Sequence, residues 1–150
     1  MRTIFDKATR DELIVRINNI NEHSTAQWGK MNVYQMLKHC TLWEEWILGR
    51  KQYKRSFIGR FVGRLALRAF IKDDRPLQRN TPTIPEFSIR YIKKDGDVAA
   101  EKAKLIALLQ EHEHVSNPGF VHSFFGKMSE EEVGYLAYKH FDHHLRQFNC

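Results

Sequence analysis

Two histidines with helical spacing, His140 and His144, are the residues best suited to chemistry in this chain. They lie in a stretch whose apolar residues recur with the period of an α-helix, where side chains four residues apart have Cβ atoms about 5–6 Å from one another. Two imidazoles in that arrangement can bind one metal ion at roughly 2.0–2.1 Å. A single inward-facing histidine is more often a core residue that hydrogen-bonds a carbonyl group, so a metal site needs a third ligand.

His39 is the candidate for that third ligand. Its segment, residues 32–49, has the ends of a helix, because Asn32 and Gln35 form a capping-box pattern and Gly49 suits a helix C-terminus. On a helical wheel His39 lies on the apolar face, together with Met36, Leu42, Trp43 and Trp46. The opposite face carries Lys38, Thr41 and Glu45. We therefore expect His39 to face the core, where it can meet the two late histidines.

Several neighbours of the predicted triad can assist it. His143 lies near the rim of the same helical face and is expected to support a ligand or contact substrate, although His140 with His143 is an alternative ligand pair. Gln147, near the centre of that face, can hydrogen-bond a metal-bound water, a ligand imidazole or a buried carbonyl. The expected wall of the substrate pocket consists of Met36, Trp43, Trp46 and His122. Residues such as Met36, Trp43 and Trp46 are more often simply core residues, and a loop histidine such as His122 is more often exposed.

The donor set predicts a divalent metal with an open coordination position. Three neutral imidazoles suit zinc first and nickel second, and iron or copper also fit this ligand type. An open position on zinc accepts a thiolate, or a water whose pKa it lowers toward about 7. No glutamate is expected on the inward face near the triad, so no general base is assigned.

Four amphipathic helices are expected to position these residues, which predicts an all-α fold. Their starts are marked by N-cap patterns at Thr9 with Glu12, Asn32 with Gln35, Asp97, and Ser129 with Glu132. The third helix should run to about His114. Between the second and third lies a long connection, and its residues 74–96 contain prolines that predict irregular structure.

The first part of that connection is strongly basic. Residues 50–79 contain ten Lys or Arg and two Asp, a net charge of +8 in a chain whose total is +6. Basic residues recur four apart among apolar ones, at Arg60, Arg64, Arg68 and Lys72, which predicts a short amphipathic helix. This helix is either a solvated face or the surface of a non-catalytic binding module for an anionic partner. No helix-turn-helix, ribonucleoprotein or finger motif supports specific nucleic-acid binding.

Length and cysteine content set the broader expectations. A chain of 150 residues suits one domain spanning residues 1–150. It has two cysteines, Cys40 and Cys150, and it shows no leader-like start and no apolar run long enough to span a bilayer. These features predict a reduced, cytoplasmic protein without a membrane span.

Three stretches resemble a bacterial family of the DinB/YfiT-like superfamily, and the likeness covers nearly the whole chain. The stretches are WGKMNVYQMLKHC (residues 28–40), NTPTIPEF (80–87) and FFGK (124–127) with HFDHHLRQF (140–148). The resemblance implies a four-helix bundle, often dimeric, with a divalent metal held by one histidine of the second helix and a late H-x-x-x-H pair. Those positions are His39, His140 and His144 here, while His143 departs from the plainer pattern.

The resemblance also narrows the expected chemistry. Members of the superfamily include metal-dependent thiol transferases, an isomerase and hydrolase-like enzymes that use low-molecular-weight thiols. We therefore expect a metal-dependent hydrolase or thiol transferase that acts on a small molecule, with a thiol as one candidate, and that forms a homodimer. The alternative is the binding module described above, in which the basic helix meets an anionic partner.

Overall fold

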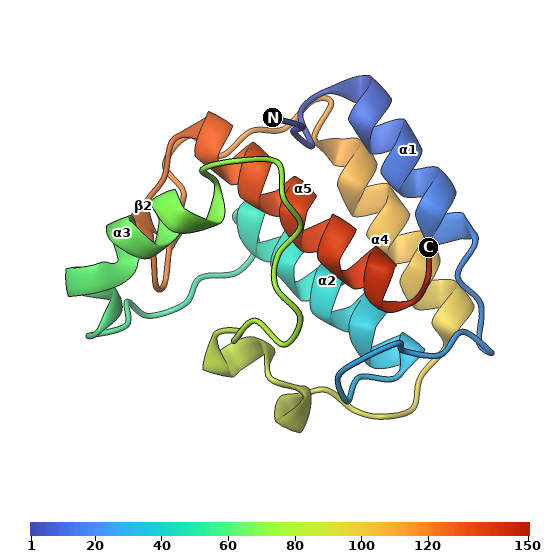
Figure 1. The fold of residues 1–150 in the computed structure, drawn as a ribbon. Helices are drawn as coiled ribbons and strands as arrows, with labels where there is room; N and C mark the ends of the chain where they lie inside the picture. Colours follow the sequence, from blue (N-terminus) through green and yellow to red (C-terminus); the bar gives the residue numbers. More distant parts are fainter.

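Helices make up most of the regular structure in the computed structural model, which describes residues 1–150 (Figure 1). The five α-helices are α1 (Lys7–Asn18), α2 (Val33–Ile47), α3 (Gly59–Phe70), α4 (Val98–Glu111) and α5 (Glu130–Gln147). Two 3₁₀ turns, η1 (Pro85–Phe87) and η2 (Ile89–Tyr91), and one short hairpin, β1 (Val121–His122) with β2 (Gly126–Lys127), complete it. The predicted all-α class is confirmed at this level, and none of the helices is both long and apolar enough to cross a bilayer.

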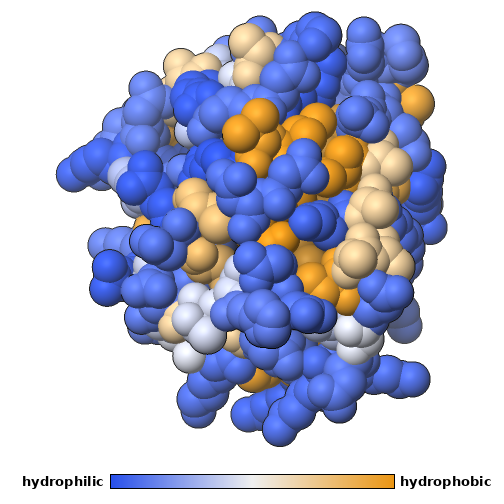
Figure 2. Space-filling view, turned by 90° about the vertical axis from the view of Figure 1, so that its right-hand side faces the viewer, coloured by the Kyte–Doolittle hydropathy of each residue, from blue (hydrophilic) through white to orange (hydrophobic).

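The four helices that were expected to position the candidate ligands, α1, α2, α4 and α5, pack side by side (Figure 1). Helix α2 contacts both α4 and α5, and α1 contacts the same two helices. One expectation is wrong: Thr41 and Glu45, which were assigned to the outer face of α2, are buried. They are buried because other helices enclose α2. The side that α1 and α4 form is mostly covered by hydrophilic residues around a central group of apolar ones (Figure 2).

Three of the four predicted helix starts are confirmed. The side chain of Asn32 accepts a hydrogen bond from the backbone N–H of Gln35 at 2.8 Å, and that of Ser129 accepts one from the backbone N–H of Glu132 at 3.1 Å. Both capping boxes are complete. Asp97 caps α4 by accepting from the backbone N–H of Ala100 at 2.9 Å. These local patterns position α2 and α5, which carry the candidate ligands.

The predicted cap of α1 is wrong by three residues. Asp6, not Thr9, is the N-cap, and its carboxylate accepts hydrogen bonds from the backbone N–H and the hydroxyl of Thr9 at 2.9 and 2.8 Å. Glu12 pairs with Arg16 rather than returning to a cap. Asp is a strong N-cap residue, and Thr9, the residue expected to be the cap, is instead the donor of both hydrogen bonds to it. Helix α4 also ends earlier than expected, at Glu111 instead of about His114.

The connection between α2 and α4 contains α3 and then an irregular segment, as predicted. The basic repeat forms α3, and residues 74–96 contain only the turns η1 and η2. This segment crosses α2 closely enough that Phe87, in η1, is 1% exposed. The hairpin of β1 and β2, which was not predicted, pairs Val121 with Lys127 and His122 with Gly126.

Candidate metal centre

Three histidines from two helices meet in the interior. His39 of α2 and His140 and His144 of α5 each offer a ring nitrogen, and these atoms all lie within 4.8 Å of one another. The closest pair, His39 Nε2 and His140 Nε2, is 2.8 Å apart. The triad expected from the helical wheels is therefore assembled in the structure, and its residue types and spacing could hold a metal ion.

Hydrogen bonds at the far side of two rings set their tautomers. His39 Nδ1 lies 3.1 Å from the carbonyl oxygen of Phe87, and His144 Nδ1 lies 2.9 Å from Gln147 Oε1. Because both oxygens only accept hydrogen bonds, each Nδ1 must carry the proton, which leaves Nε2 with a free lone pair. This is the arrangement by which metal-binding histidines are usually oriented.

The third ring, His140, has no such partner, since its buried Nδ1 makes no hydrogen bond. At 2.8 Å, His39 Nε2 and His140 Nε2 cannot both present lone pairs to each other. His140 Nε2 therefore carries a proton and donates it in a hydrogen bond to His39 Nε2. The free Nδ1 lets His140 change tautomer, so a cation can replace that proton without a new charge on the ring.

Burial keeps all three imidazoles neutral. Loss of solvent lowers the pKa of His39 to about 4, although its hydrogen bond to Phe87 opposes the shift. Burial, and then the charges of neighbouring imidazoles, lower the pKa of His140 and His144 well below the ordinary value. Neutral imidazole is the form that binds a cation, so the triad is ready to bind one at neutral pH.

Aromatic rings surround the triad on the α2 side. The ring of Trp43 lies 4.8 Å from that of His140, and the ring of Phe87 lies 5.7 Å from that of His39, centre to centre. Trp46 and Met36 are buried in the same core. Trp43 therefore lies directly beside the triad, while Met36 and Trp46 are packed in the core.

His122 is buried rather than exposed on a loop. Its Nδ1 accepts hydrogen bonds from the backbone N–H groups of Phe124 and Phe125, both at 3.1 Å, and its ring stacks 4.6 Å from Trp46. Burial first, and then the nearby Arg55 cation, lower its pKa to about 3. The hairpin folds this histidine back onto α2, which no local sequence pattern indicates.

A cleft of about 490 Å³ opens at the C-terminal end of α5. Its lining consists of Gln27, Trp28, Pro76, Leu77, Arg79, His143, Arg146, Asn149 and Cys150. His143 is the only predicted pocket residue among them, and its ring lies 5.1 Å from that of His144. The histidine expected at the rim thus stands between the triad and the cleft.

Gln147 connects the triad to the cleft wall. While its Oε1 accepts from His144, its Nε2 donates to the carbonyl oxygen of Trp28 at 2.8 Å. Gly29, with φ of +80°, allows this approach, because a Cβ there would lie 2.6 Å from Gln147 Nε2. Of the roles considered for Gln147, the structure shows two at once, a bond to a ligand imidazole and a bond to a buried carbonyl.

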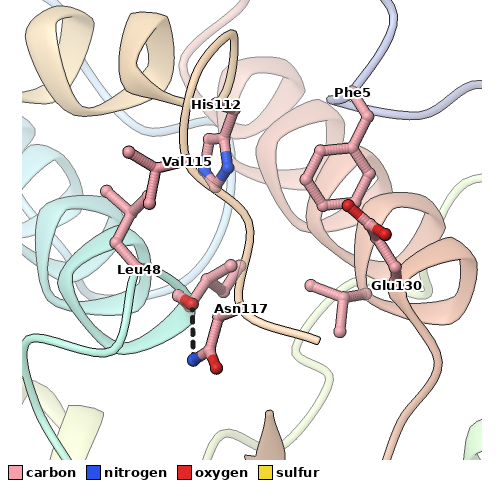
Figure 3. Close-up of a pocket in the computed structure, with 8 residues that line it drawn as sticks. Phe5, Leu48, His112, Val115, Asn117 and Glu130 are labelled. Atoms are coloured by element: carbon pink, nitrogen blue, oxygen red, sulfur yellow. Dashed lines mark hydrogen bonds between the residues drawn. The ribbon is translucent and has the colours of Figure 1, made fainter. Parts of the chain in front are cut away.

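Another buried pair was not predicted. His112 Nε2 lies 2.5 Å from Glu44 Oε2, with side chains 1% and 0% exposed. His112 also lines a cavity of about 10 Å³, room for at most a single water, beside Phe5 and Asn117 (Figure 3). This cavity adjoins the N-terminal end of α5, away from the cleft. The usable sequence signal was the position of His112 four residues after Leu108, on the apolar face of its helix.

Comparisons with known proteins identify the family but not an activity. No curated protein and no solved structure matches the chain. The resemblance to the DinB/YfiT-like superfamily stays a prediction after these comparisons. A family model described as "Protein of unknown function (DUF1569)" matches residues 5–150, nearly the full length, and the chain therefore belongs to the DUF1569 family.

Proposed function

We propose that this protein is a metal-dependent enzyme that holds a divalent cation on His39, His140 and His144 and acts on a small molecule. The observation that carries the proposal is the convergence of three neutral imidazoles, two of them fixed with Nε2 unprotonated. Structural histidines normally have their ring nitrogens satisfied by protein groups. Here protein oxygens satisfy the outer nitrogens of His39 and His144, and the inner Nε2 of His39 meets only another imidazole, that of His140, at 2.8 Å.

A cation bound at this centre would supply Lewis acidity, acidifying a water or thiol that enters its open position. The protein residues supply position and exclusion of water. Phe87 and Gln147 orient two of the ligands, while the Trp43 ring covers His140. His143 is the residue best placed to accept a proton from a substrate, since burial lowers its pKa and leaves it neutral at pH 7.

The cleft is where we place the substrate. Arg79 makes no ion pair, and its guanidinium lies 4.6 Å from the ring centre of Trp28. Arg146 also lines the cleft, although its Nε is held 2.7 Å from Asp142. Two guanidinium groups beside His143 favour a substrate with a carboxylate or another anionic group.

The reaction class in the proposal comes from the resemblance to the DinB/YfiT-like superfamily, which implies hydrolysis or transfer of a low-molecular-weight thiol. One ligand on α2 and an H-x-x-x-H pair on α5 agree with what that resemblance implies. Zinc is the first expectation and nickel the second, because imidazole ligands suit both. Pairing into a homodimer belongs to the same proposal.

Elemental analysis of the untagged protein tests the metal site. We expect near one equivalent of zinc or nickel in the wild type and its loss from His39→Ala and His144→Ala. His114→Ala is the matched control, because His114 is exposed and distant in sequence from the ligands. Circular dichroism must show the same helix content in all four proteins. Absence of metal after reconstitution with zinc and nickel would refute the proposal.

The reaction class needs a second experiment with the metal-loaded protein. Hydrolysis is tested with ester and amide substrates that carry a carboxylate, and thiol transfer with low-molecular-weight thiols and an electrophilic acceptor. Activity that depends on metal and weakens in Arg79→Gln would support both the centre and the cleft. Metal-dependent activity unchanged in Arg79→Gln would leave the centre supported and exclude the cleft as the anion site.

A further inference from the structure

Helix α3 exposes large apolar side chains to solvent. Phe57, which precedes the helix, and Phe61 and Leu65 within it are 73%, 75% and 72% exposed, and Ile58 is 64% exposed. In Figure 1 α3 lies at one side of the molecule, away from α1 and α4. Single exposed apolar residues are ordinary, but several adjacent ones on one short helix mark an interaction surface.

The inner side of α3 is fixed, so this apolar surface cannot turn inward. A Cβ added at Gly59 or Gly63 would overlap the carbonyl oxygen of Phe124, which shows how closely the helix packs on the hairpin. Leu67 is fully buried on the same side. At the C-terminal end, the buried Lys139 donates a hydrogen bond to the carbonyl oxygen of Phe70 at 2.6 Å.

Cations border the apolar surface, and three of the four form no ion pair. Arg60, Arg68 and Lys72 are exposed and form no ion pair, whereas Arg64 is bound to Glu132 at 2.8 Å. They belong to the 50–79 segment, in which ten Lys or Arg face two Asp. The surface is therefore both apolar and strongly positive.

We infer that α3 docks this protein on an anionic membrane surface, with Phe57, Ile58, Phe61 and Leu65 entering the interface between headgroups and acyl chains. A second copy is disfavoured, because a two-fold contact places the same patch on both subunits and would bring two segments of charge +8 together. A nucleic acid would use the cations but has no use for the aliphatic side chains of Ile58 and Leu65. An anionic bilayer uses both features.

Vesicle flotation of the full chain tests this inference, which does not depend on the proposed enzyme activity. The protein should float with vesicles of phosphatidylcholine mixed with phosphatidylglycerol and not with phosphatidylcholine alone. Phe61→Ser with Leu65→Ser should weaken partitioning at least about tenfold, because two large side chains no longer enter the interface. Arg60→Gln with Arg68→Gln should also weaken it about tenfold or more, at low salt.

Matched controls carry the same chemical changes elsewhere. Val15→Ser removes an apolar side chain of α1 that is 62% exposed, and Lys93→Gln with Lys94→Gln removes two exposed cations outside the basic segment. Both should float like the wild type, and all variants should keep the wild-type circular dichroism and thermal midpoint.

Two results would overturn the inference. One is a wild-type protein that fails to float with anionic vesicles, or whose flotation survives both α3 double substitutions. The other is a dimer, seen by analytical ultracentrifugation, that Phe61→Ser with Leu65→Ser dissociates, since this would assign the surface to a second copy.

Discussion

Replacing Gln147 with leucine should weaken metal binding although every ligand remains. The amide of Gln147 accepts a hydrogen bond from His144 Nδ1 at 2.9 Å and donates one to the carbonyl oxygen of Trp28 at 2.8 Å. Leucine has a similar size but neither polar atom. The imidazole of His144 would then be free to rotate and to exchange tautomers, and the Trp28 carbonyl would lose its partner.

The expected magnitudes follow from these two bonds. Loss of a hydrogen bond that orients a metal ligand typically lowers metal affinity about 10–100-fold, which corresponds to about 1.4–2.7 kcal/mol. Loss of two intramolecular hydrogen bonds at about 1 kcal/mol each should lower the free energy of unfolding of the metal-free protein by about 2 kcal/mol. For a chain of this length that is a fall in Tm of roughly 4–8 °C.

Gln147→Glu is the control that separates the two bonds. A carboxylate still accepts a hydrogen bond from the His144 Nδ1–H group, and a stronger one than an amide accepts. It cannot donate a hydrogen bond to the Trp28 carbonyl. Competition against a chromophoric zinc chelator should therefore show affinity lost in the leucine variant and retained or raised in the glutamate variant. Thermal unfolding without metal should show both variants destabilised. Unchanged zinc affinity in the leucine variant, or an equal loss of affinity in the glutamate variant, would show that the bond from His144 to residue 147 does not support metal binding.

Three further predictions concern other parts of the structure. Acid should destabilise the metal-free protein, because the pKa of His39 is about 4 in the folded state and about 6.5 in the unfolded chain. The unfolded chain therefore takes up the proton first. The free energy of unfolding is highest above about pH 6.5 and falls as the pH drops toward 4. Denaturant titrations from pH 7 to about pH 4 measure this, and a flat profile would contradict it. Glu44→Ala leaves the buried His112 imidazole without its partner and should lower the free energy of unfolding by about 3 kcal/mol, with metal content unchanged. Gly63→Ala places a methyl group against the Phe124 carbonyl and should weaken the packing of α3 on the hairpin. Limited proteolysis should then cut faster within residues 50–79. A wild-type rate of cleavage would show that the hairpin shifts to accommodate the methyl group.

The histidine triad was predictable because each of its residues lies on a regular helix. A helix fixes which side chains share a face. The helical recurrence of apolar residues around His39, His140 and His144 was therefore enough to predict that all three face the interior. The capping boxes at Asn32 and Ser129 were predictable for the same reason, since they involve residues three apart. Patterns that span about one helical turn were therefore enough to locate both helices that carry the histidine triad.

The hydrogen-bond partners of the buried histidines could not be predicted from such local patterns. The partner of His39 is the backbone carbonyl of Phe87, which carries no sequence signature and lies 48 residues away. The Glu44–His112 pair joins helices 68 residues apart, and the bond between Gln147 and Trp28 joins segments 119 residues apart. The bonds of His39 and Gln147 depend on how irregular connections cross the helices, and the Glu44–His112 pair depends on how α2 packs on α4. Tertiary packing decides both.

Long separation along the chain also determines when the triad can form. His39 and His140 meet across 101 residues, so their contact closes one of the longest loops in the molecule. Loops of that kind close only when most of the chain has packed, and a ligand that needs them has little to bind in earlier states. A cation held by α2 and α5 would therefore lower the rate of unfolding far more than it would raise the rate of folding, and so would increase the kinetic stability of the native state.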